Sequence, residues 1–158
     1  PSMKYSKGRK DVSVTEQGGI LTLSMPKASD GEGSRDLSVH LNVDSTMMIN
    51  LVNSRAYLVN TGERNSHINM NISDTHLTTS DDVNTENFFL GSLKLTATNR
   101  SEVRLNNINI GNLMLNLQHS AFGEEKSTFQ NIQLQADDSS RVSMMSTHLL
   151  KLNQNSQQ

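Results

Sequence analysis

Apolar and polar residues alternate along most of the chain in short runs, and these runs recur at a nearly constant spacing. Runs of alternation begin at Met47, Ile68, Leu93, Leu113, Ile132 and Leu152. The spacings between these starts are 21, 25, 20, 19 and 20 residues. Alternation with a period of two predicts strands with one apolar face, and a superperiod near twenty residues is typical of stacked repeats.

Each repeat places apolar residues in three clusters. The first cluster is a triple at i, i+2 and i+4: Met47/Ile49/Leu51, Ile68/Met70/Ile72, Leu93/Leu95/Ala97, Leu113/Leu115/Leu117 and Ile132/Leu134/Ala136. The second contains Ala56, Leu77, Val103, Phe122 and Val142, and the third contains Leu90, Ile110, Phe129 and Leu149. One coil cannot bury its own triple, so the next coil must cover it. The pattern predicts an all-β fold: a single-stranded, three-sided parallel β-helix, or β-solenoid, with about 20 residues per coil.

Antiparallel hairpins with the same spacing are the structural alternative. Such hairpins usually carry Asn-Gly or Asp-Gly turns between their strands. The chain has one such dipeptide, Asp30-Gly31, and it lies outside the repeat. The solenoid is therefore favoured over the hairpin array.

A hydroxyl residue follows each triple by three or four positions: Ser54, Thr75, Ser101, Ser120 and Ser140. A small hydroxyl at a crowded bend can bond to the backbone of its own coil or of the next one. We therefore expect these residues to be structural rather than nucleophilic or in contact with a glycan. Gly91 and Gly111 each precede a triple by two residues, where a corner with positive φ is expected.

The same pattern predicts three regions along the chain. Residues 1–18 are a basic tail and lead-in, residues 19–153 are the solenoid domain, and residues 154–158 are a polar tail. The segments Ile20 to Met25 and Leu37 to Val43 are expected to cap one end of the solenoid. The longest repeat has an excess of five residues around Thr78 to Phe89, which predicts a protruding loop, with partner binding as the alternative.

Composition narrows the classes of function. The chain of 158 residues is 34% hydrophobic, has a net charge of −2 and contains no cysteine. No global charge attracts it to nucleic acid, and neither disulfides nor thiolate chemistry are available. No run of eighteen apolar residues is present, so no membrane span is expected. The chain begins with Pro1, which we interpret as a processed or trimmed product, compatible with export.

Candidate chemistry is sparse, and no catalytic, cofactor-binding or metal-ligating residue is predicted. The acidic pairs Asp81-Asp82 and Asp137-Asp138 fall at expected corners or loops, where Asp favours turns. The histidines His40, His67, His76, His119 and His148 lack zinc-site spacing and are expected to be polar surface residues. Motifs for a nucleophile elbow or a phosphate-binding loop are absent.

The stretches LKLTATNRSEVRLNNINIGNLMLNLQHSAFGEE and IQLQADDSSRVSM each combine an alternating strand with a serine and a further apolar step. In this respect the chain, from about Gly19 to Asn153, resembles the GIN domain, an autotransporter adhesin head domain of Bacteroidetes that was formerly a domain of unknown function. The resemblance implies a right-handed β-solenoid that is exported to the periplasm or cell surface and has an adhesive or envelope role. It carries no catalytic residue over to this chain.

These observations leave three hypotheses for function. The first is a non-enzymatic cell-envelope or adhesin-like module that binds glycan or a cell-surface protein without a cofactor. The second is a glycan-cleaving β-helix that uses the acidic pairs together with Arg100, Arg104 and Arg141. The third is a structural envelope protein that self-associates through the open ends of its solenoid.

Overall fold

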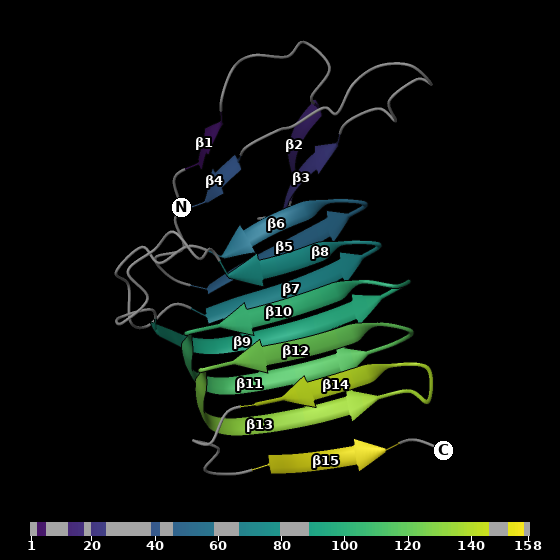
Figure 1. Cartoon of the computed structure of the whole chain (residues 1–158). Helices are drawn as coiled ribbons and strands as arrows, with labels where there is room; N and C mark the ends of the chain where they lie inside the picture. Colours follow the sequence, from purple (N-terminus) through teal and green to yellow (C-terminus); the bar gives the residue numbers. More distant parts are fainter. Residues whose placement is uncertain are drawn as a thin grey trace. The chain divides into compact units, whose positions relative to one another are not determined.

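The computed structural model describes residues 3–5, 13–17, 20–24, 39–41, 46–58, 67–79, 89–145 and 152–156. The chain divides into two compact units, one spanning 1–42 and the other 43–158. The described residues contain strands and turns but no helix (Figure 1).

The first unit contains two antiparallel pairs. Its strands are β1 (Met3–Tyr5), β2 (Ser13–Gln17), β3 (Ile20–Ser24) and β4 (Val39–Leu41). β1 pairs with β4, and β2 pairs with β3 in a register that sets Gln17 opposite Ile20. The two residues between β2 and β3 in the sequence are Gly18 and Gly19, a composition typical of a two-residue hairpin.

The solenoid unit therefore begins at Val43, whereas the sequence pattern placed its start at Gly19. Alternation has the same period in a hairpin and in a solenoid coil, so the pattern alone does not separate the hairpin strand at Ile20 from the solenoid domain. At the other end, the ladder reaches Ser156 and so includes three residues of the segment 154–158, expected to be a tail.

The second unit is a parallel β-solenoid of about four turns with about 20 residues per turn, which confirms the predicted fold class. Its larger sheet contains β5 (Thr46–Val52), β7 (His67–Ser73), β9 (Phe89–Thr98), β11 (Asn109–Leu117), β13 (Thr128–Ala136) and β15 (Leu152–Ser156). Its smaller sheet contains β6 (Arg55–Leu58), β8 (His76–Thr79), β10 (Glu102–Asn106), β12 (Ala121–Glu125) and β14 (Arg141–Met144). Strands of the two sheets alternate along the chain and run in opposite directions (Figure 1).

The registers align the predicted apolar clusters from coil to coil. The first residues of the triples form one row, Met47, Ile68, Leu93, Leu113 and Ile132, on the six-stranded sheet. Ala56, Leu77, Val103, Phe122 and Val142 form one row on the five-stranded sheet. Most members of these rows with a described side chain are buried, and together they form the core.

The third cluster lies within the long strands of the six-stranded sheet. Leu90, Ile110 and Phe129 are buried and aligned, and the register is interrupted directly after each of them. The interruption marks a bend, visible as a turn of the ribbon at the start of β11 and β13 (Figure 1). The coils of β9, β11 and β13 therefore have the first and third predicted clusters within one continuous strand, whereas Leu149 lies outside the described residues.

Several corners with positive φ are occupied by residues other than glycine. Within the described residues, φ is positive at Asn53, Asp74, Asn99, Arg100, Asn107, His119 and Lys126. Asn, Asp and His are the residue types that best tolerate this conformation after glycine. The expectation of a positive φ at Gly111 is wrong, because its backbone lies outside that region. A Cβ atom at Gly111 would lie 2.6 Å from the Gly91 carbonyl oxygen, so close approach between coils requires glycine there.

Candidate functional site

The hydroxyl residues of the first corner form a column with hydrogen bonds between coils at every step except Ser101 to Ser120, where the Ser101 N–H donates to the Thr98 carbonyl of its own coil. The backbone N–H of Thr75 donates to the Ser101 hydroxyl at 3.2 Å, and that of Ser120 donates to the Ser140 hydroxyl at 3.1 Å. The N–H of Ser54 donates to Thr75 Oγ1 at 3.3 Å. Ser101 and Ser120 are also buried. The structural role predicted for these residues is confirmed, and their hydroxyls are occupied by the fold.

Asp137 belongs to this column rather than to an acidic catalytic pair. Its carboxylate accepts the Ser140 hydroxyl at 2.7 Å and the backbone N–H of His119 at 2.9 Å and 3.1 Å. The hydrogen bond from Ser140, followed by that from the His119 backbone, lowers the pKa of Asp137 from its ordinary value of 3.8. A carboxylate bonded in this way closes the corner before Ser140, which is one residue longer than the corner before Ser120. The fold thus gives Asp137 a structural role.

The outer face of the six-stranded sheet is dominated by uncharged polar side chains. Asn71 donates an amide hydrogen to Asn50 at 2.8 Å, and Asn131 donates one to Asn112 at 2.9 Å. Asn71 aligns with Thr96, which continues this row along the solenoid through Asn116 and Gln135. The structure describes the outward side chains of β5, β7, β9, β11 and β13 in part. Among those described, Lys94 is the only Lys, Arg, Asp or Glu residue.

The amide face has spare hydrogen-bonding capacity. A side-chain amide has two donor hydrogens and an acceptor oxygen with two lone pairs. Each of these two Asn–Asn hydrogen bonds uses one donor of one residue and one acceptor position of the other. Met48 and Met114 lie on the same face and are each 42% exposed, so apolar surface is interspersed with the amides. The face can therefore offer both hydrogen bonds and apolar contact to a ligand.

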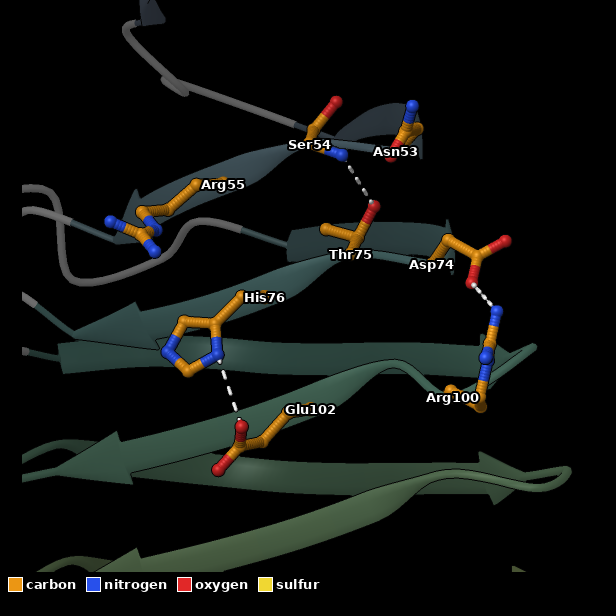
Figure 2. A pocket seen from close by; sticks show the side chains of 8 residues that line it. All are labelled: Asn53, Ser54, Arg55, Asp74, Thr75, His76, Arg100 and Glu102. Carbon is orange, nitrogen blue, oxygen red and sulfur yellow. Dashed lines mark hydrogen bonds and ion pairs between the residues drawn. The ribbon is translucent and has the colours of Figure 1, made fainter. Parts of the chain in front are cut away.

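The outer face of the five-stranded sheet is charged by contrast. His76 Nδ1 lies 3.2 Å from Glu102 Oε2, and Arg104 Nε donates to Glu102 Oε1 at 2.7 Å. At the adjoining corner, Arg100 Nη2 lies 3.6 Å from Asp74 Oδ1. Figure 2 shows the His76–Glu102 and Asp74–Arg100 contacts, which lie around an open depression of about 430 Å³. Its lining residues are Asn53, Ser54, Arg55, Asp74, Thr75, His76, Arg100 and Glu102.

The structure distributes the residues singled out in the sequence over separate places. His67 lies on the amide face, where its Nδ1 is 2.8 Å from Ser92 Oγ, whereas His76 lies on the charged face. Arg104 contacts Glu102 on its own strand, and Arg141 lies two coils beyond them, in the row of Glu102. The structure does not bring these arginines to Asp137. Asp81, Asp82, His148 and residues 80–88 of the expected loop lie outside the described residues, as does the side chain of His40.

The sequence analysis missed a buried carboxylate, Glu124. It is 3% exposed and occupies an inward row between Leu105 and Met144. Its Oε2 accepts the backbone N–H of Ser127 at 3.4 Å, next to the second corner of the coil. The alternation could have revealed it, because Glu124 follows the inward Phe122 by two residues.

Among the described residues, no three His, Asp or Glu side chains gather closely enough to hold a metal ion. None of the described segments forms a helix long and apolar enough to cross a membrane. No protein-family model, curated protein or solved structure matches this chain.

Proposed function

We propose that this chain is a non-enzymatic, adhesin-like module of the cell envelope that binds glycan through the outer face of its six-stranded sheet. The observation that carries the proposal is the amide face itself: rows of Asn, Gln, Thr and Ser side chains aligned from coil to coil. Amides and hydroxyls both donate and accept hydrogen bonds, which suits the hydroxyl groups of sugars. The proposal includes an exported location, at the periplasm or cell surface, and membership of the GIN domain family that the repeat resembles.

The low charge of the face favours a neutral ligand. A ligand rich in carboxylate or sulfate would require several basic groups on the face. The described outward positions of these strands contain one lysine, Lys94, and no arginine. A protein partner is the alternative ligand of the same face. Protein interfaces are enriched in aromatic residues and arginine at their centre. The described outward positions of these strands contain no arginine and a single Phe, Tyr or Trp, the half-buried Phe89 at the start of β9. We therefore favour glycan over protein.

The test is retention of the purified chain on immobilised neutral, acidic and sulfated polysaccharides, with new chain ends measured in the same samples. We expect retention on a neutral polysaccharide and no new chain ends. The variant Gln133→Lys places a charge on the exposed amide face and should weaken binding about tenfold, which corresponds to about 1.4 kcal/mol.

The matched control is Gly123→Lys, which places the same charge on the opposite sheet. A Cβ atom at Gly123 would meet no atom within 4 Å, so the substitution fits without displacing neighbours. Gly123→Lys should bind like the unmodified chain. If Gly123→Lys loses binding while Gln133→Lys retains it, the glycan site lies on the charged face instead. No retention on any polysaccharide would contradict the proposed function.

A glycan-cleaving enzyme is the second candidate, and one observation favours it. Asp74 and Glu102 line the same depression, and glycosidases use two carboxyl groups at the scissile bond. Both carboxylates already contact other side chains: Asp74 contacts Arg100, and Glu102 contacts His76 and Arg104. New chain ends that disappear in Glu102→Gln would establish this activity and refute the non-enzymatic proposal.

A further inference from the structure

Met114 is an exposed apolar residue in the interior of the amide face. It lies on β11, which pairs with β9 on one side and with β13 on the other, and it is 42% exposed. The three strands lie side by side in Figure 1. A single exposed apolar residue is common on protein surfaces, so the informative feature is what surrounds it.

Amide side chains surround Met114 on three sides. An outward residue inside a sheet has two neighbours on its own strand, about 6.6 Å away, and three on each adjacent strand, which lies about 4.8 Å away. Five of these eight neighbours of Met114 carry amides: Asn112, Asn116, Asn131, Gln133 and Gln135. On the β9 side the neighbours are Ser92, Lys94 and Thr96. We refer to Met114 and the five amides as the Met114 cluster.

The amides of the Met114 cluster have donors and acceptors to spare. Asn131 donates one amide hydrogen to Asn112 Oδ1 at 2.9 Å, and among the described residues this is the one hydrogen bond that joins two of the five side chains. An amide has two donor hydrogens and an oxygen that can accept twice. Asn112 therefore keeps both donors in this bond, and Asn131 keeps its acceptor oxygen. Both side chains are exposed, so a ligand can reach them.

We propose that the Met114 cluster recognises the N-acetyl group of an amino sugar, so that the ligand of the amide face is a neutral polysaccharide of N-acetylated amino sugars. An N-acetyl group combines a methyl group with one carbonyl oxygen and one N–H. The methyl group contacts Met114, the carbonyl oxygen accepts a hydrogen from one amide of the cluster, and the N–H donates to the oxygen of another. This inference rests on the proposed function, because it names the glycan that the same face binds.

The apolar centre distinguishes an acetylated sugar from one that carries hydroxyl groups alone. Hydroxyl groups can bond to the amides, but they leave the side chain of Met114 against polar atoms. An acetyl methyl group removes apolar surface of Met114 from water, which is favourable. The cluster therefore offers a complement to both parts of the substituent, the apolar methyl and the polar amide.

Lys94 distinguishes the acetylated sugar from the free amine. It lies directly opposite Met114 on β9, and its side chain is exposed. None of the ion pairs between described residues includes it. An amino sugar without the acetyl group becomes a cation when protonated, and like charges in contact are unfavourable. The acetylated sugar is neutral, and its carbonyl oxygen can accept a hydrogen bond from the ammonium group of Lys94.

The test compares three hexasaccharides with the same β-1,4 backbone, built from N-acetylglucosamine, glucose or glucosamine. Their dissociation constants for the full chain are measured by isothermal titration calorimetry at pH 6, where the amine of glucosamine is protonated. We expect the N-acetylglucosamine oligomer to bind about tenfold more tightly than the glucose oligomer, and the glucosamine oligomer to bind most weakly.

Met114→Gln locates the preference on the sheet. The substitution keeps the length of an exposed side chain, so the far-ultraviolet circular dichroism spectrum should not change. The variant should bind the N-acetylglucosamine oligomer no more tightly than the glucose oligomer, with affinity for the glucose oligomer unchanged. Met145→Gln is the matched control: Met145 is 69% exposed, directly after β14 and outside the six-stranded sheet, and this variant should keep the full preference.

The outcomes separate this inference from the proposed function. Equal binding of the N-acetylglucosamine and glucose oligomers, or a preference that survives Met114→Gln, would overturn the inference and leave glycan binding by the amide face intact. The same holds if the chain is retained on another neutral polysaccharide but does not bind the N-acetylglucosamine oligomer. Tighter binding of the glucosamine oligomer than of the acetylated one would also overturn the inference. Retention on no polysaccharide would refute both proposals.

Discussion

Replacement of Ser101 by alanine tests whether the corner column stabilises the solenoid. The Ser101 hydroxyl accepts the backbone N–H of Thr75 from the preceding coil and donates to the carbonyl oxygen of Thr98 at 2.7 Å. Ser101 and Thr75 are 1% and 2% exposed, so water does not readily replace the lost partner. The substitution therefore acts on two coils at once.

The size of the effect follows from which groups lose a partner. The Thr98 carbonyl still accepts the N–H groups of Asp74 and Ser101, so it remains bonded in Ser101→Ala. The Thr75 N–H loses its acceptor and stays buried. A buried donor left without a partner costs about 1–3 kcal/mol, and we expect a loss of that size in the free energy of unfolding.

The assay is urea unfolding followed by circular dichroism. Ser143→Ala serves as the control, because Ser143 is exposed on β14 and a substitution there should change stability by less than about 0.5 kcal/mol. The slope of free energy against urea should stay the same in both variants, since the surface exposed on unfolding is the same. If Ser101→Ala is as stable as Ser143→Ala, the hydroxyl column does not hold the coils together, and the structural explanation for the recurring serine is wrong.

Two further predictions concern the corners. Gly111→Ala should destabilise the chain by about 1–3 kcal/mol in the same assay, because its Cβ would lie 2.6 Å from the Gly91 carbonyl oxygen, whereas Gly123→Ala should not. Asp137 has a lowered pKa, chiefly through the Ser140 hydroxyl, so its contribution to stability is present above the ordinary pKa of 3.8 and is lost as pH falls through the lower folded value. The stability difference between the unmodified chain and Asp137→Asn should thus be constant near neutral pH and shrink below about pH 4; a difference that grows on acidification would contradict this role.

The repeat made the inner organisation of the solenoid predictable from the residues alone. Each triple must face the core, and a shift of one residue would expose every apolar side chain, so the register follows from the alternation. Leu93, Leu113 and Ile132 accordingly lie in one row. The role of Ser101 was also predictable, because a small hydroxyl side chain that recurs at a crowded bend can bond to the backbone of its own coil or of a neighbouring one.

Other features depended on contacts that the pattern does not encode. The strand at Ile20 alternates like a solenoid strand, yet it pairs antiparallel with β2. Asp137 lies at a corner, as expected, but the hydrogen bond that it accepts from the His119 backbone of the preceding coil could not be predicted from the pattern. Gly111 is required by a carbonyl from another coil, which no local rule for φ could identify.

The sequence of this protein thus determined which residues face inward and how many residues form a coil, because burial of apolar side chains depends on local alternation and on a repeated length. The tertiary structure alone decided which outward residues meet. Alignment of the coils gathered the amides on one sheet and brought His76 to Glu102 on the other. Side chains twenty or more residues apart become neighbours only when the coils stack, so the candidate sites arise from the register between strands.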